Sequence, residues 1–320
     1  MKRKNILQMV TLLILGLGVL FSLVAFDNPY FWQSKQLVEI SVIVREADST
    51  SWATARQGME QAAADLDAEL RFLTLNSPDS VKEQKDLLAR EVDGGAKGIV
   101  LVPANPQQMQ QEVQDATTKA VVVTMESDMA ESGATACISV DNRKMGEALA
   151  GKALGRLAAG DDVVLLDSAP GSSGVSARVD GAERLLKAAG CNVYRYTLSA
   201  GQNLSSLITK AIATQRPAAI LAFDTAATQQ AASVAENTEN PPLLYGTGAT
   251  NTIIASLEQG SIDATAAQNE FAAGYLAVEA AVKAVQKMPA PDIKTLTYYL
   301  VDRQNMDDAD NQKLLFPVTR

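Results

Sequence analysis

The sequence predicts a two-lobed α/β protein in which each lobe is a parallel sheet flanked by helices, with an N-terminal transmembrane helix before them. Short apolar runs rich in β-branched residues alternate with longer runs of helical spacing along most of the 320 residues. The alternation occurs as two successive series, which predicts two sheets with a cleft between them. A long uncharged apolar run near the N-terminus predicts the transmembrane helix.

The uncharged run covers residues 6–26. About 20 helical residues are enough to cross the roughly 30 Å hydrocarbon core of a bilayer. The basic residues Lys2, Arg3 and Lys4 precede the run and Asp27 follows it. This charge distribution predicts a cytoplasmic N-terminus and an extracytoplasmic body.

The end of the run lacks a secretory cleavage site, because Leu23 stands where a small residue is required before Ala25. The aromatic residues at 30–32 are typical of the outer membrane–water interface. We therefore expect residues 1–36 to form an uncleaved signal anchor with a short linker. The alternative is a cleaved signal, which would release a secreted or periplasmic protein.

The body of the protein is acidic. The net charge is −9, and without the three basic N-terminal residues it is −12. Nucleic acid is therefore a poor partner. The sequence has no histidine, the commonest zinc ligand and general acid–base group, and we expect neither a metal nor a cofactor. Cys137 and Cys191 are expected to be free buried thiols, although a disulfide between them is possible.

Eight nearly continuous apolar runs have the length of strands that are covered on both faces by helices. The first series is VEISVIV (38–44), LRFLTL (70–75), KGIVLV (97–102) and AVVVTM (120–125), and the second is DVVLLD (162–167), NVYRYTL (192–198), AAILAF (218–223) and PLLYGTG (242–248). Ligands of open α/β sheets bind beyond the carboxyl ends of strands. Asn76, Glu126 and Asp224 directly follow such runs and are candidate ligand-binding residues.

Three motifs occur in a characteristic order. SVDNRKMG (139–146) lies between the two series, SSGVSARVDGAERLL (172–186) follows the first strand of the second series, and SIDATAAQNEFAAGYLAVEAA (261–281) ends a strand in glutamine before an alanine-rich helix. With these motifs, residues 38–305 resemble the type I periplasmic binding proteins, in particular the ribose- and galactose-binding group of sugar transporters. The resemblance implies that the chain crosses three times between the lobes.

The implied lobes are residues 37–140 plus 268–290 and residues 141–267 plus 291–320, with a hinge at the crossings. Position by position, the resemblance also implies a set of ligand-binding residues: Trp52, Asn76, Glu126, Asp141, Arg178, Asp224 and Gln268. An indole face would contact the C–H side of a sugar ring, while carboxylates and the guanidinium would bind hydroxyl groups. The family arginine that often follows the fourth-strand carboxylate is Ser127 here, and the identity of the sugar stays open.

Structural roles are the alternative for these residues. Trp52 suits a packing position on an amphipathic helix, Glu126 and Asp224 suit helix caps, and Arg178 could pair with a carboxylate on its own helix. Asp141 can cap the helix that follows it.

The resemblance implies an extracytoplasmic solute-binding protein that closes on a sugar or polyol and serves an ABC permease. A sensory role beside a membrane histidine kinase is the alternative for the same closure. An enzyme is less expected, because the sequence lacks histidine, a metal motif and a nucleophile elbow. A transcriptional repressor of this fold would need a DNA-binding helix pair where the apolar run lies.

Overall fold

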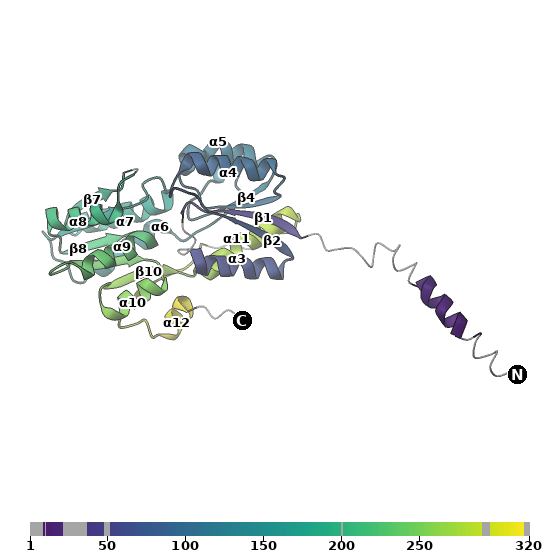
Figure 1. Ribbon diagram of the computed structural model, residues 1–320. Helices are drawn as coiled ribbons and strands as arrows, with labels where there is room; N and C mark the ends of the chain where they lie inside the picture. Colours follow the sequence, from purple (N-terminus) through teal and green to yellow (C-terminus); the bar gives the residue numbers. More distant parts are fainter. Residues whose placement is uncertain are drawn as a thin grey trace. The chain divides into compact units, whose positions relative to one another are not determined.

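The computed structural model describes residues 9, 11–21, 37–47, 52–199, 201–289 and 295–316. The chain divides into two units, Met1–Leu37 and Val38–Arg320. In the first unit, residues 11–21 are helical (Figure 1). No helix within the described ranges combines the length and the apolar character needed to cross a membrane. The remainder of the apolar run, residues 23–25 and the linker lie outside the described residues.

The second unit begins with a five-stranded, all-parallel sheet in the order β2-β1-β3-β4-β5. Its strands are β1 (Val38–Ile43), β2 (Ala68–Leu73), β3 (Gly98–Leu101), β4 (Val121–Met125) and β5 (Ala136–Ile138). The helices α4 (Val81–Asp93) and α5 (Pro106–Thr117) cover one face, and α3 (Ala53–Asp65) and α11 (Glu270–Val285) cover the other (Figure 1). Because successive strand residues point to opposite faces, this lobe has two separate apolar cores.

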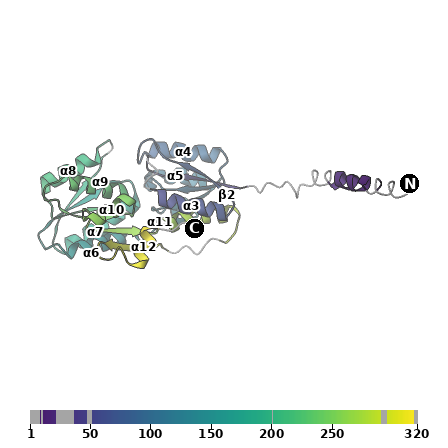
Figure 2. The ribbon, with the colours of Figure 1, turned by 60° about the horizontal axis from the view of Figure 1, so that its bottom comes forward.

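The second sheet has six strands in the order β11-β10-β9-β8-β6-β7. Its strands are β6 (Asp162–Asp167), β7 (Asn192–Thr197), β8 (Ala219–Ala222), β9 (Leu243–Thr247), β10 (Ala264–Gln268) and β11 (Tyr298–Asp302). The helices α6 (Asn142–Leu154) and α7 (Ser173–Ala188) cover one face, while α8 (Leu204–Gln215), α9 (Thr225–Glu236), α10 (Asn251–Gln259) and α12 (Ala309–Leu315) lie on the other (Figure 2). The two-lobed α/β architecture is therefore confirmed.

The second sheet is not purely parallel, which corrects the prediction. β11 was absent from the predicted runs and pairs antiparallel to β10, with Gln268 opposite Tyr298. The chain leaves this sheet at the end of β10, builds α11 on the other lobe, and returns at the same end of the sheet. A strand that enters where its neighbour leaves must run in the opposite direction.

Each lobe contains one pair of helices whose backbones touch through glycines. In the first lobe, a Cβ on Gly58 of α3 would overlap the carbonyl of Phe271, and a Cβ on Gly274 of α11 would overlap the carbonyl of Ala55. In the second lobe, Gly146 of α6 meets the carbonyl of Arg178, and Gly181 of α7 meets that of Arg143 in the same way. The glycines thus allow the first residues of these helices to lie close together beside the strand ends.

The two cysteines are free thiols, as expected. Cys191 is buried and its Sγ lies 3.7 Å from the carbonyl oxygen of Ala158. Cys137 is only partly buried, and burial raises the pKa of its thiol to about 11. A thiol with this pKa is protonated at neutral pH and is a poor nucleophile.

Candidate functional site

The candidate site lies where the carboxyl ends of strands from both sheets meet. Arg45 and Glu46 follow β1, Glu126 follows β4, and Glu270 opens α11 two residues after β10 ends. From the second lobe come Arg178 on α7 and Asp224 after β8. We call the set Arg45, Glu46, Asp79, Glu126, Arg178, Asp224, Gln268 and Glu270 the cleft cluster.

Arg45 is the centre of the cluster on the first lobe. Its side chain is 6% exposed and forms ion pairs with Asp79 (2.8 Å), Glu46 (3.3 Å) and Glu126 (3.6 Å). Burial disfavours its charge, but these carboxylates and Asp224 together hold the pKa of Arg45 well above its usual value. Since Asp224 belongs to the second lobe, this electrostatic interaction joins the two sides of the cleft.

Two carboxyl groups of the cluster have strongly raised pKa values. Burial, with the negative charge of Glu126, raises the pKa of Glu46 to about 7, even though Arg45 and the Trp52 N–H oppose the shift. Burial and the same Glu126 charge raise the pKa of Glu270 to about 7. In both groups burial is the largest cause and the charge of Glu126 adds to it, so each carboxyl group is partly protonated at pH 7.

Glu126 adopts a backbone conformation that is uncommon for a residue with a side chain. Its φ is 62°, in the left-handed region that favours glycine. The conformation is held by its carbonyl oxygen, which accepts hydrogen bonds from Asn142 Nδ2 (3.0 Å) and Ser139 Oγ (3.1 Å). Such strain concentrates at functional sites, and here it directs the carboxylate toward Arg45.

Arg178 is fixed by the protein itself. It is 5% exposed, its Nε donates to Asn142 Oδ1 at 2.7 Å, and its Nη1 donates to the carbonyl oxygen of Phe223 at 3.0 Å. Its guanidinium forms no salt bridge with another described residue. The alternative role, an ion pair with a carboxylate on its own helix, is therefore absent from the described residues. The group is held in one orientation at the cleft.

Asp224 also has its hydrogen bonds within the second lobe. It caps α9 by accepting from the backbone N–H of Ala227 at 2.7 Å, and Ser168 Oγ donates to its other oxygen. The capping role foreseen as an alternative is therefore present. Its charge still reaches Arg45 across the cleft.

Gln268 and Glu270 lie side by side at the crossing between the lobes. Gln268 Nε2 donates to Glu270 Oε1 at 3.0 Å. Gln268 is 8% exposed, and its Oε1 is buried without a hydrogen-bond partner among the described residues. Glu126 Oε2 and Arg45 Nε are also buried without a hydrogen-bond partner, and they lie 3.6 Å from each other. Those two atoms form an ion pair that is longer than a hydrogen bond. Buried polar atoms without a hydrogen bond are costly, and all three belong to the cleft cluster.

Trp52 contributes differently from the sequence expectation. It is 5% exposed and packs in the apolar core of the first lobe, so its ring is not an open platform for a sugar in this structure. Its Nε1 donates to Glu46 Oε2 at 2.6 Å. The indole thereby orients a carboxylate of the cluster.

Asn76 and Asp141 lie outside the cluster. Asn76 is exposed, and both its backbone N–H and its side-chain amide donate to Glu83. Asp141 caps α6 through the N–H of Lys144 (3.1 Å), and that hydrogen bond lowers the pKa of its carboxyl group. Its side chain is 40% exposed. No hydrogen bond or ion pair between described residues links either one to the cluster.

Sequence reasoning missed four members of the cluster: Arg45, Glu46, Asp79 and Glu270. The signal was available for two of them, because Arg45 and Glu46 directly follow the first predicted strand, at the place where ligand-binding residues were sought. Glu270 is the first residue of a helix, where an acidic side chain is common for reasons of helix stability alone.

The two lobes touch beside the cluster. The N–H of Gly174, on α7, donates to Ser127 Oγ at 3.3 Å, and a Cβ on Gly174 would lie 2.7 Å from the carbonyl oxygen of Glu126. A Cβ on Gly171 would likewise lie 2.7 Å from the carbonyl oxygen of Ala104. Glycines at these two positions let the backbones of the lobes approach each other.

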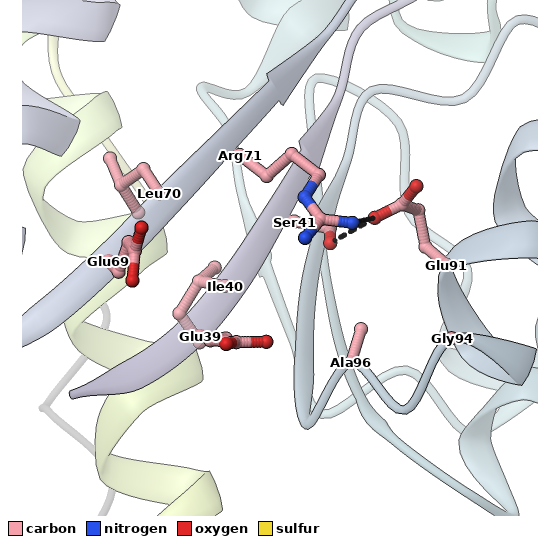
Figure 3. Close-up of a pocket in the computed structure, with 9 residues that line it drawn as sticks. All are labelled: Glu39, Ile40, Ser41, Glu69, Leu70, Arg71, Glu91, Gly94 and Ala96. Atoms are coloured by element: carbon pink, nitrogen blue, oxygen red, sulfur yellow. Dashed lines mark hydrogen bonds and ion pairs between the residues drawn. The ribbon is translucent and has the colours of Figure 1, made fainter. Parts of the chain in front are cut away.

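A separate cavity of about 140 Å³ lies at the amino ends of β1 and β2, away from the strand ends that form the cleft (Figure 3). Glu91 is 3% exposed there and accepts from Ser41 Oγ (2.8 Å) and Arg71 Nη1 (3.2 Å). Figure 3 shows both partners pointing at the same carboxylate. The carboxylate of Glu91 in this cavity thus already has partners within the protein.

Solved structures with the same fold cover most of this chain. A carbohydrate transporter solute-binding protein from Agrobacterium radiobacter in complex with D-arabinose is 19% identical, with 88% of this chain and 100% of that chain covered and a TM-score of 0.80. GanP, a glucose-galactose binding protein from Geobacillus stearothermophilus, is 19% identical, with 85% and 100% covered and a TM-score of 0.74. The XylFII–LytSN complex is 18% identical, with 84% and 98% covered and a TM-score of 0.75.

No match was found among curated protein sequences. The family model described as periplasmic binding protein domain matches residues 40–288, which is most of the chain. This match agrees with the resemblance carried by the three sequence motifs and with the two-lobed fold. The chain belongs to the periplasmic binding protein domain family and has its type I fold.

Proposed function

We propose that the protein is an extracytoplasmic, membrane-tethered solute-binding protein whose lobes close on a small polar ligand, a sugar or polyol, for an ABC-type permease. The observation that carries the proposal is the cleft cluster, in which charged and amide groups from both lobes meet. A ligand that contacts both lobes binds the closed form better than the open one. Binding therefore shifts the population toward closure, and closure is what a partner recognises.

The ligand class rests on the chemistry of the cluster and on related folds. Carboxylate and amide oxygens accept hydrogen bonds from hydroxyl groups, and Arg45 Nε offers a donor. Proteins of this fold were solved with D-arabinose, α-D-tagatopyranose and D-fucose. In our proposal the cluster recognises its ligand and performs no catalysis.

The partner is proposed to be a permease, with a membrane sensor as the second candidate. The XylFII–LytSN complex supports the second candidate, because it places a protein of this fold in a specific assembly with another protein. Cross-linking of the tethered protein in native membranes, followed by mass spectrometry, tests both. Recovery of permease subunits would support transport, and recovery of a histidine kinase would support sensing.

The membrane tether is proposed from the uncharged run at residues 6–26. Its test is mass spectrometry of the N-terminus of the mature protein together with membrane fractionation. An intact N-terminus in the membrane fraction is expected. A chain that begins near residue 26 would instead make this a freely diffusing binding protein.

Thermal-shift measurements on the full chain in mild detergent test the ligand class. A ligand at one hundred times its dissociation constant stabilises the folded protein by about 2.7 kcal/mol. Glu126→Gln should reduce the shift, while Glu60→Gln, on the exposed face of α3, serves as the matched control. An unchanged shift in Glu126→Gln would disprove the proposed site, and no response to any sugar or polyol would disprove the ligand class.

A further inference from the structure

The cleft cluster has an excess of negative charge. Its cations are Arg45 and Arg178, and its carboxyl groups are Glu46, Asp79, Glu126, Asp224 and Glu270. Arg45 is shared by three carboxylates, and Arg178 is occupied by neutral acceptors. Within the described part of the chain, Glu270 has no ion pair and only the Gln268 amide as its hydrogen-bond donor.

Three buried atoms of the cluster have no hydrogen bond to another described residue, although Glu126 Oε2 and Arg45 Nε form an ion pair with each other. Two of them, Gln268 Oε1 and Glu126 Oε2, are acceptors without donors. The third, Arg45 Nε, is a donor without an acceptor at hydrogen-bond distance. The cluster thus has more carboxyl groups than cations, two buried acceptors without a hydrogen-bond donor and one buried donor without a hydrogen-bond acceptor.

We propose that the cleft selects ligands that carry an ammonium group beside their hydroxyl groups, that is, amino sugars or amino polyols. This inference rests on the proposed function and specifies its ligand. An ammonium group supplies three donors and a full positive charge, which match the orphaned acceptors and the carboxylates of the first lobe. Ligand hydroxyl or ring oxygens supply the acceptor for Arg45 Nε.

Two other ligand classes fit less well. A neutral sugar would supply donors but would leave the surplus carboxylates uncompensated as the lobes exclude water. An anionic ligand would add repulsion, because both guanidinium groups already have partners. An ammonium group removes the imbalance, and by stabilising the ionised carboxylates it lowers the pKa values of Glu46 and Glu270 from about 7.

Matched ligand pairs test the inference with the full chain. The probes are D-glucosamine with D-glucose, D-galactosamine with D-galactose, and D-glucamine with D-glucitol, compared by calorimetric titration at pH 7. Because a charged hydrogen bond is worth more than a neutral one, the amino member of the pair that fits the cleft should bind about tenfold more tightly or better.

The pH dependence gives an independent readout. The alkylammonium of D-glucamine stays charged up to about pH 9, since its pKa is close to that of lysine. Its binding should release protons and should strengthen between pH 6 and pH 8, as Glu46 and Glu270 become ionised. Glu270→Gln should reduce the preference for the amino member and the number of protons released, while Glu60→Gln should change neither.

The outcomes separate the inference from the proposed function. If a neutral member binds as tightly as its amino partner or more tightly, the charge inference is wrong and the proposed function stands. If no member of any pair binds, the inference is rejected and the sugar and polyol class loses its support as well. If the amino preference survives in Glu270→Gln and in Glu126→Gln, the cleft cluster does not cause it and the inference fails.

Discussion

The two lobes present different kinds of surface to the same cleft. The second lobe offers Arg178 and Asp224, whose hydrogen bonds are already made within that lobe. The first lobe offers carboxylates that share one arginine, and Glu270, which accepts a hydrogen bond from Gln268 at the end of β10 in the second sheet. We infer that the second lobe is preorganised, whereas the first lobe keeps its unsatisfied groups for a ligand.

The scaffold behind these surfaces is alike in both lobes. Each has a pair of helices packed through two glycines, α3 with α11 and α6 with α7. The difference between the lobes therefore lies in the side chains at the strand ends. Four predictions follow this comparison, from the largest effect to the smallest.

If the two scaffolds are equivalent, adding a methyl group at a glycine contact should lower the free energy of unfolding by a similar amount in either lobe. Gly146→Ala and Gly274→Ala each place a Cβ on a backbone carbonyl, and we expect a loss of roughly 1 to 3 kcal/mol or more in the free energy of unfolding. Gly151→Ala, on the same helix as Gly146, is the control, because the nearest atom to its Cβ is Leu185 Cδ2 of α7 at 3.9 Å, and it should be neutral or stabilising. Chemical denaturation measures all three.

Weakening the arginine of the second lobe should cost stability without any ligand present. Arg178→Lys cannot reproduce the fork that reaches both Asn142 and Phe223, and we expect a loss of about 1 to 3 kcal/mol in the free energy of unfolding. Arg143→Lys, at an exposed position on α6, serves as the control. A negligible loss in Arg178→Lys would show that the second lobe is not held as rigidly as we infer.

Removing a carboxyl charge from the first lobe should raise, not lower, the free energy of unfolding at neutral pH. The folded pKa of Glu270 is raised to about 7 from an ordinary value of 4.5, so the folded protein binds the extra proton. Its contribution to stability is fully present below pH 4.5 and is lost as the pH rises through 7. Glu270→Gln and Glu46→Gln should flatten the fall in melting temperature between pH 4.5 and 7.

Melting curves at closely spaced pH values measure that fall, and Glu60→Gln controls for the loss of an exposed glutamate. A fall of unchanged steepness in both cleft variants would contradict the raised pKa values and weaken the contrast between the lobes.

The smallest effect is expected at Asp141. Its carboxylate caps α6, so Asp141→Ala should lower the free energy of unfolding by about 0.5 to 2 kcal/mol. Ligand affinity should stay within twofold of the parent, as measured by calorimetry. Asp141→Asn is the control, since asparagine also caps helices. A large loss of affinity in both variants would restore Asp141 to the binding site, as the sequence resemblance implied.

The sequence predicted the strands and the two lobes because both depend on local apolar runs. It did not predict β11. The position of this strand depends on its pairing with β10, in which Tyr298 lies opposite Gln268, 30 residues earlier in the chain. Glu126 and Asp224 were predicted from their positions after strands, and both lie in the cleft cluster. Asn76 and Asp141 have the same kind of position, but their polar groups are taken up by Glu83 and Lys144, which sequence alone could not distinguish.

Arg45 and Glu270 show why half of the cluster escaped sequence reasoning. Each is a charged residue at the end of an element, where solvation or helix stability is a sufficient explanation. Only the three-dimensional structure shows that Glu126 lies near both of them.

The excursion through α11 bears on how the protein is made. The core of the first lobe contains Ala273, Ala277 and Val278, which are synthesised after almost all of the second lobe. The first lobe therefore cannot complete its core while the ribosome is still translating the second one, in contrast to domains that fold in order from the N-terminus. A chain that stays incompletely folded until late in synthesis is still unfolded enough to be translocated across a membrane.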